Sequence, residues 1–361
     1  MMKITKKDFL RRILVQVVFI VALYGVATLL MATGVINDYV GQIMITSTVF
    51  AIMALGINLV TGMTGQLLLG QAGFMAIGGY TAAILLKNGV PMLAALLVAA
   101  LFAALLGLLV GIPLFRLRGD YLAIVTLALG EIIVVVLNNL GDLTGGASGL
   151  MGIRGIVSMA VPYSKLITFL WVSLFLVLTL LALVHLMTST HGRAILSVRE
   201  DEIAAESMGI NTHYTKVFAY AISTFLAGLA GALFATESGY LNPSQFNFLS
   251  SVNYLVIVVF GGLGSITGTV LSGYLLTMLQ ETVLRNLPTV PIFGFQLALA
   301  DYRLVIYPLL LILMMIFRPQ GLLGTRELPL LKMSHWSWWS HTLHRWGDWW
   351  KARLNGPRKG N

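Results

Sequence analysis

The stretch "MLAALLVAALFAALLGLLVGIP", residues 92–113, contains no charged side chain. An α-helix rises about 1.5 Å per residue, so about 20 apolar residues cross the roughly 30 Å hydrocarbon core of a bilayer. Similar apolar stretches lie at 13–33, 40–61, 66–86, 120–140, 166–188, 217–236 and 303–317. The repetition predicts an all-α polytopic membrane protein with about eight full transmembrane helices.

The composition supports the same class. The chain has 361 residues, of which 58% are hydrophobic and 10% charged, and its mean hydropathy is +0.88. A soluble protein of this length needs far more polar surface, so that class is excluded. The formal net charge is +9, but the basic residues cluster beside the apolar stretches, where the positive-inside rule explains them. We therefore expect no nucleic-acid partner. The absence of cysteine excludes disulfides.

Charge placement predicts the organisation of the chain. Residues 1–12 form a basic N-terminus, which we expect in the cytoplasm. The apolar stretch 13–33 has no small-residue cleavage site behind it, so we interpret it as a retained first helix of a membrane domain at 13–318. Alternation of the helices then places the charged loop 189–216 and the C-terminal tail 319–361 in the cytoplasm as well.

The segment 251–284 has two interpretations. It is apolar and long enough to span, but "GGLGSITG" at 261–268 should break a helix. Either the segment dips in and returns, or it crosses twice. Eight full helices plus one broken segment is the preferred count, and ten is the alternative.

Glycines interrupt an earlier apolar segment in the same way. They stand at Gly62, Gly65, Gly70, Gly73, Gly78 and Gly79, and the spacing G-x-x-G of the first two recurs at Gly261 and Gly264. Two Gly-interrupted segments, one in each half of the chain, are typical of transporters whose path lies between repeated halves. The alternative is close packing of helices through small residues.

Polar residues within the apolar stretches are candidates for lining a path. Asn58, Gln66 and Gln71 accompany the first glycine segment, and Glu131 and Asn138 share one helical face of 120–140. A carboxylate at such depth costs at least about 2.5 kcal/mol, so Glu131 should face protein or water. Each could contact substrate, or could instead satisfy backbone groups or a neighbouring helix.

The charged segment "REDEIAAESMGINTHYTK", residues 199–216, stands out in this apolar chain. Ala204 and Ala205 favour a short helix with a small-residue face, and Gly209 follows where a left-handed helix end is common. We predict a short docking helix here, with an ordinary solvated loop as the alternative.

"AAESMG" at 204–209 resembles the A-A-x-x-x-G core of the EAA loop of ABC-transporter permeases. In that pattern the acidic position falls on Ile203, with Glu202 one residue early, and the usual hydrophobic-Pro ending is absent. Four blocks extend the likeness: "LRGDYLAIVTLALGEIIVVVLNNLGDLTGG" at 117–146, "REDEIAAESMGIN" at 199–211, "FLAGLAGALFA" at 225–235 and "FGGLGSITGTVLSG" at 260–273. Together they are similar to LivM-type permease subunits of branched-chain amino-acid ABC importers, a family that also includes LivH and is related to urea and amide importer permeases.

The resemblance implies the partners and the coupling residues. It implies a LivH-like second permease subunit, two cytoplasmic ATPase subunits and a periplasmic substrate-binding protein, assembled in a bacterial inner membrane. By this resemblance the ATPase-coupling residues are Arg199, Glu202, Ala204, Ala205, Glu206 and Gly209. The chain lacks the G-x-x-x-x-G-K-[ST] phosphate loop, so we expect no ATP site, cofactor or enzymatic activity of its own.

Other functions remain open at this stage. They are a urea or amide importer permease, an ion-coupled secondary transporter with Glu131 as the coupling acid, and a membrane enzyme or scaffold, although no catalytic set assembles. The tail "HWSWWSHTLHRWGDWWKARLNGPRK" at 335–359 combines tryptophans with cations, which predicts a helix lying on membrane lipid. His341 and His344 have no further ligands nearby in sequence, so we expect no metal site.

Overall fold

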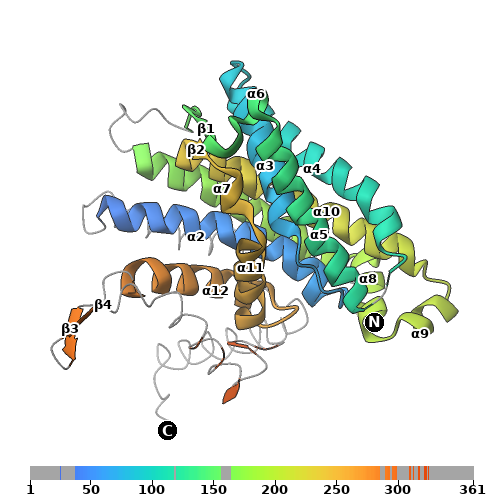
Figure 1. Ribbon diagram of the computed structural model, residues 1–361. Coiled ribbons are helices and arrows are strands. Elements are labelled where there is room, and N and C mark those ends of the chain that lie inside the picture. The colour runs from blue at the N-terminus through green and yellow to red at the C-terminus, as the bar shows by residue number, and fades with distance from the viewer. Residues whose placement is uncertain are drawn as a thin grey trace, which may run out of the picture. The chain divides into compact units, whose positions relative to one another are not determined.

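The computed structural model describes residues 37–117, 119–155, 164–284, 289–292 and 295–298, with a few single positions besides (Figure 1). The helices expected at 13–33 and 303–317 and the tail at 319–361 lie outside the described residues, apart from those single positions.

Five helices in the described part of the chain are long and apolar enough to cross a membrane. They are α2 (Asp38–Ile57), which continues as the π-turn η1 (Asn58–Gly62), α4 (Met92–Leu114), α5 (Asp120–Asn139), α7 (Ser164–Thr188) and α10 (Thr212–Ser238). They match the predicted stretches 40–61, 92–113, 120–140, 166–188 and 217–236. The polytopic all-α class is thereby confirmed.

The helix expected at 66–86 begins later than predicted. Residues 65–70 are not helical, and α3 runs from Gln71 to Lys87. Gly65 has a φ of +74°, which a helix cannot contain, and Gly70 packs so closely on Thr126 of α5 that a Cβ atom there would overlap its carbonyl. The chain therefore passes α5 as irregular, non-helical backbone before α3 begins.

The segment 251–284 forms two helices. They are α11 (Phe248–Gly261) and α12 (Ile266–Met278), the latter continuing as the π-turn η4 (Leu279–Leu284). Gly262 and Gly264 turn the chain between them with φ values of +110° and +87°. With 14 residues, α11 spans only about 21 Å, less than a hydrocarbon core. The predicted break is thus confirmed: a glycine turn separates the short helix α11 from α12.

Helix α10 packs against α2, α3 and α4 at the centre of the described structure. Small residues make the approach possible: a Cβ atom on Gly231 would overlap the carbonyl oxygen of Met75 in α3, and one on Gly107 of α4 would overlap the side chain of Thr224. This is the small-residue packing that is common between membrane helices.

Short helices, turns and strands follow the long helices α5 and α10. After α5 come α6 (Gly141–Thr144), the 3-10 turn η2 (Gly146–Ser148) and strand β1 (Leu150–Met151). Strand β1 pairs antiparallel with β2 (Tyr240–Leu241), Leu150 opposite Leu241, and the 3-10 turn η3 (Pro243–Phe246) then leads into α11. Strands β3 (Thr289–Ile292) and β4 (Phe295–Ala298) form a hairpin after η4.

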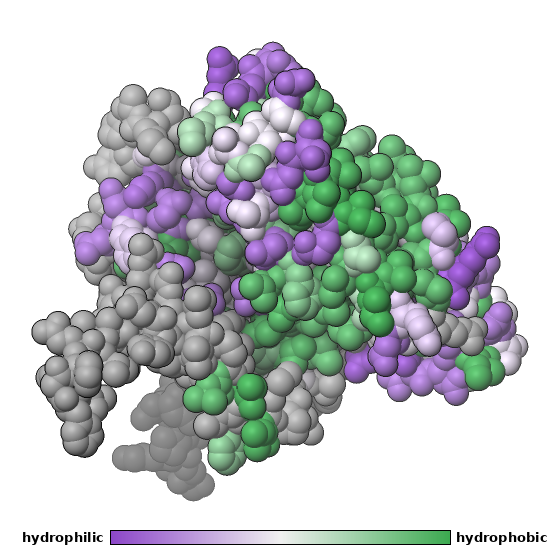
Figure 2. Space-filling view, viewed as in Figure 1, coloured by the Kyte–Doolittle hydropathy of each residue, from purple (hydrophilic) through white to green (hydrophobic). Residues whose placement is uncertain are grey.

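The long helices differ in how far the chain itself covers them. The most apolar window of α2 is 83% buried, whereas those of α4 and α5 are each 33% buried. Figure 2 shows the resulting hydrophobic surface on the side of α4 and α5. On α4 it includes Leu97, Leu101, Leu105 and Leu109.

Candidate functional site: a coupling helix and a glycine junction

Two short helices, α8 (Thr190–Glu200) and α9 (Glu202–Ser207), form the charged segment between α7 and α10. Asp201 separates them, and its Oδ1 accepts hydrogen bonds from the backbone N–H groups of Ile203 (2.9 Å) and Ala204 (3.0 Å). A carboxylate in this position satisfies the first free N–H groups of a helix. Gly209 follows α9 with a φ of +84°. The predicted short helix and its glycine end are therefore confirmed, with a second helix before it.

Helix α9 is fastened to the start of α10. The Nζ atom of Lys216 lies 2.7 Å from Oε2 of Glu202, and their side chains are 3% and 27% exposed. Ala205 is also buried. Two of the expected coupling residues, Glu202 and Ala205, thus face the chain itself and hold α9 in place. Sequence reasoning did not predict this ion pair.

The opposite face of α9 is open. Ile203 is 74% and Met208 83% exposed, although both are large and apolar. Ala204, Glu206 and Gly209 are exposed beside them. A small helix that presents apolar side chains next to an alanine has the form of a surface on which another protein can dock.

Arg199 connects α8 with both glycine-broken segments. A Cβ atom placed on Gly65 would lie 3.6 Å from Cγ of Arg199, and one placed on Gly264 would lie 2.7 Å from its Nη1. The guanidinium and its stem therefore lie directly against the backbone of the two segments. Gly65 and Gly264 both have positive φ values, +74° and +87°.

The two segments also contact each other, in what we call the glycine junction: Asn58, Gly62, Gly65, Gly264 and Ser265. Asn58 is fully buried; its Nδ2 donates to the carbonyl of Ser265 (3.0 Å), and its Oδ1 accepts from the N–H of Gly264 (2.8 Å). A Cβ atom on Gly62 would overlap both Oδ1 of Asn58 and the nitrogen of Gly264. One amide side chain thus satisfies backbone that the glycine turn exposes.

The helix is distorted at the junction. Residues 58–62 form a π-turn, a local widening that is frequent at functional sites. The carbonyl of Val60 accepts from the N–H groups of both Thr64 (3.2 Å) and Gln66 (3.3 Å). Gln66, a predicted path residue, lies half-buried just beyond this turn. Gly261, also predicted there, instead packs on Gly268 of α12.

A second cluster lies where α3 and α11 begin. The N–H of Ala72 donates to Oγ of Ser251 (3.1 Å), so the first turns of both helices touch. Gln71 is buried there; its Nε2 donates to Oγ of Ser223 (3.1 Å), while its Oε1 has no hydrogen-bond partner among the described residues.

Glu131 of α5 belongs to this second cluster. Its Oε1 accepts from the N–H of Phe248, the first residue of α11, at 2.7 Å. Asn247 caps the same helix by accepting from the N–H of Ser250 (3.1 Å). A carboxylate at a helix N-terminus also interacts favourably with the helix dipole. Glu131 thus makes the contact with a neighbouring helix that was expected of a structural residue. Asn138 joins neither cluster, and its side chain is exposed near the end of α5.

One buried acid escaped the sequence reasoning. Glu237 stands in the last turn of α10, one residue after the end of the predicted stretch 217–236. Its Oε1 accepts from Nε2 of Gln42 and Oγ1 of Thr46, both at 2.6 Å, and its Oε2 is buried with no hydrogen-bond partner in the described structure. The missed signal was an acidic residue in the final turn of a membrane-length helix.

No group of three or more His, Cys, Asp or Glu side chains that could hold a metal ion occurs among the described residues. What the described geometry offers is a docking face on α9, an arginine that reaches the glycine junction, and a capped start of α11. These contacts hold the helices of this region to one another.

Comparison with known proteins identifies the family. Residues 39–315 match the model of the family "Branched-chain amino acid transport system / permease component". The chain is 36% identical over 312 residues to the high-affinity branched-chain amino acid transport system permease protein LivM of Escherichia coli, covering 80% of this chain and 70% of that protein.

More distant relatives carry similar names. BraD of Pseudomonas aeruginosa is 30% identical over 187 residues, covering 52% of this chain and 54% of that protein. LivH of Salmonella typhimurium is 25% identical over 296 residues, covering 77% and 92%. No solved structure matches the chain. The chain therefore belongs to the family of branched-chain amino acid transport permeases, whose members are transport subunits of ABC importers and not enzymes.

Proposed function

We propose that the chain is one of two permease subunits in an ATP-driven importer of branched-chain amino acids in a bacterial inner membrane. The second subunit is LivH-like, two cytoplasmic ATPase subunits supply the work, and a periplasmic binding protein delivers the substrate. The names of LivM, BraD and LivH, each a permease of a branched-chain amino acid transport system, support this substrate class. The uncovered apolar faces of α4 and α5 suit contact with membrane lipid.

The end of the molecule that carries α8 and α9 faces the cytoplasm in this proposal. Arg193, Arg199 and Lys216 belong to that region, and Arg116 follows α4. Basic residues next to membrane helices are retained on the cytoplasmic side, which also places both termini there.

The α9 face is the docking site for an ATPase subunit. Ile203, Ala204 and Met208 present exposed apolar surface, while the Glu202–Lys216 ion pair fixes the other face to α10. A push on α9 therefore moves α8 and the start of α10 with it.

The position of Arg199 carries the proposal. It extends from α8 to Gly65 and Gly264, so a displacement of α8 acts directly on the glycine junction. That junction joins the end of α2 to the turn between α11 and α12. Work done at α9 thus reaches the broken helices in one step, and they open or close the path.

Glu131 serves as a cap in this scheme and not as a proton carrier. Its hydrogen bond to Phe248 supports that role, and ATP hydrolysis by the partner subunits makes ion coupling unnecessary. Energy transfer is mechanical.

The test uses the complete transporter in proteoliposomes, with ATP inside and loaded binding protein outside. Replacing the exposed Ala204 by tryptophan should cut leucine uptake per ATP hydrolysed by roughly ten-fold or more, because the bulky ring blocks the close approach of the ATPase. Ala94→Trp, at an exposed alanine of α4, is the matched control and should leave the ratio unchanged.

Equal loss of coupling in both variants, or none in Ala204→Trp, would refute the docking role of α9. Uptake of urea or a short amide in place of leucine would refute the substrate class alone. Uptake driven by a proton gradient without ATP would refute the ABC mechanism.

A further inference from the structure

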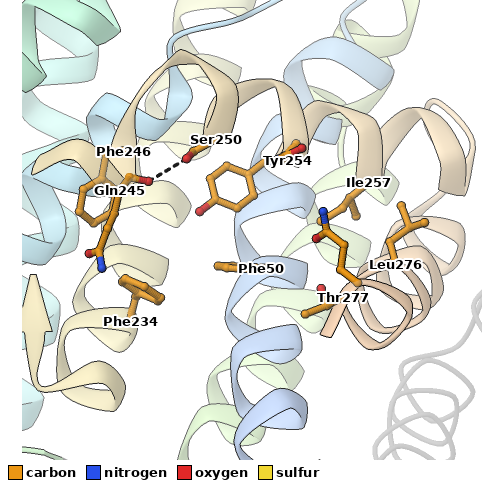
Figure 3. A pocket seen from close by; sticks show the side chains of 11 residues that line it. Phe50, Phe234, Gln245, Phe246, Ser250, Tyr254, Ile257, Leu276 and Thr277 are labelled. Atoms are coloured by element: carbon orange, nitrogen blue, oxygen red, sulfur yellow. Dashed lines mark hydrogen bonds between the residues drawn. The ribbon is translucent and has the colours of Figure 1, made fainter. Parts of the chain in front are cut away.

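A cavity of about 150 Å³ lies between α2, the end of α10, η3, α11 and α12 (Figure 3). Four aromatic side chains form one side of it: Phe50, Phe234, Phe246 and Tyr254. Their rings contact one another, with centroids 6.2 Å apart for Phe50 and Phe234, 5.2 Å for Phe50 and Tyr254, and 6.1 Å for Phe234 and Phe246. Ile257 and Leu276 line the far side. This lining suits an apolar group of a few carbon atoms.

Amide side chains border the same cavity. Gln245, Asn253 and Gln280 belong to its lining, and Gln245 and Asn253 are exposed. The amides of Asn253 and Gln280 make no hydrogen bond within the part of the chain that the structure describes. An amide offers both N–H donors and a carbonyl acceptor, so it can take the carboxylate or the ammonium end of a zwitterion. Small-ligand sites typically combine an apolar wall with a few such orienting groups.

The size of the cavity limits its occupant. An apolar cavity of about 150 Å³ accepts a molecule as large as benzene. The aliphatic side chains of leucine, isoleucine and valine have three or four carbon atoms and fit this space. The cavity also reaches the first turn of α11, through Ser250, whose Oγ donates to the carbonyl of Gln245 (2.7 Å). It therefore adjoins the helix whose opposite end forms the glycine junction.

We propose that this cavity is a site on the path of the transported amino acid. The cavity holds the aliphatic side chain of the amino acid against the four aromatic rings, while the amides of Asn253 and Gln280 face the charged end of the amino acid. The inference rests on the proposed function and deepens it, because it assigns a place for the substrate. Movement of α11, which connects cavity and junction, then opens or closes the site.

The experiment alters the volume of the cavity and measures selectivity between leucine and valine, which differ by one methylene. Thr277→Phe fills the cavity from α12, and Phe50→Ala enlarges it from α2. A methylene in an apolar pocket changes selectivity by roughly 10- to 200-fold. In the reconstituted complete transporter, Thr277→Phe should therefore lower the leucine-to-valine uptake ratio about ten-fold, and Phe50→Ala should raise it. Leu271→Phe, at an exposed position on the same helix α12, should leave the ratio unchanged.

A leucine-to-valine uptake ratio equal to that of the wild type in both cavity variants would overturn the inference. An equal loss of leucine and valine uptake in every assembled variant would overturn it too, because a lipid chain in the cavity would cause that result. If Thr277→Phe does not assemble, the direction of the shift in Phe50→Ala decides. A wild-type complex that takes up neither leucine nor valine would refute the proposed function itself, whereas normal uptake with unchanged ratios would refute only the cavity site.

Discussion

The two ends of α11 are built differently. At Gly261–Gly264 the helix ends in a junction where Asn58 binds the backbone of the turn and Arg199 lies against Gly65 and Gly264. There is no room for even a methyl group at Gly62. At Phe248 it begins beside a cavity bordered by amide side chains, and hydrogen bonds of Glu131, Asn247 and Ser251 hold this end. A closed, interlocked end transmits displacement, whereas an open end with free polar groups can admit a ligand. In the proposed mechanism the same short helix therefore links movement to binding.

The largest expected effect comes from breaking the closed end. Gly62→Val should lower the free energy of unfolding by about 3 kcal/mol or more, because its Cβ would overlap Asn58 and Gly264. Thermal unfolding in detergent measures the loss. Gly141→Val is the control, since no atom lies within 4 Å of a Cβ there. Similar stability of the two variants would show that the junction is not tightly packed.

The ion pair between Glu202 and Lys216 should lose different amounts of stability depending on which partner is replaced. Glu202→Gln leaves the positive charge of Lys216 without its partner, on a side chain that is only 3% exposed. Lys216→Met instead leaves the negative charge of Glu202 without its partner, on a side chain that is 27% exposed and better hydrated. We expect a loss of about 2–3 kcal/mol for Glu202→Gln and less for Lys216→Met. Denaturation of both variants and of the double variant measures this; equal losses would contradict a buried lysine charge.

The smallest effect is expected at the open end. Glu131→Gln keeps a carbonyl oxygen that can accept from the N–H of Phe248, so stability and uptake should change little. Glu131→Leu removes the acceptor and should cost about 1 kcal/mol, as other lost helix caps do. Parallel unfolding and uptake measurements on both variants check this. Loss of uptake in Glu131→Gln with normal stability would restore the proton-carrier role.

The sequence was informative wherever one helix could be considered alone. Apolar length predicted α2, α4, α5, α7 and α10, and glycine predicted both the break after α11 and the end of α9. It could not predict burial: neither α2 nor α4 has a distinct polar face, yet their most apolar windows are 83% and 33% buried.

Contacts between distant segments were also beyond reach. The G-x-x-G spacing shared by Gly62/Gly65 and Gly261/Gly264 indicated a relation between the two segments. Only the fold brings Asn58 and Gly264, 206 residues apart, into hydrogen-bonding contact. Glu202 was assigned to ATPase coupling by resemblance, and Ala205 to a docking face by its small side chain as well. The packing of α9 on α10 turns both side chains inward. Glu237 was missed because the apolar stretch was ended one residue too early.

The distance in sequence between Asn58 and its partners has a consequence for biogenesis. Ribosomes deliver α2 long before Gly264 and Ser265 emerge, so during synthesis the amide of Asn58 enters the bilayer without the groups it will later bind. A buried amide without partners is costly in hydrocarbon. The amide of Asn58 therefore lacks its native partners until the last third of the chain has been inserted, and a chain that stops before Gly264 never supplies them.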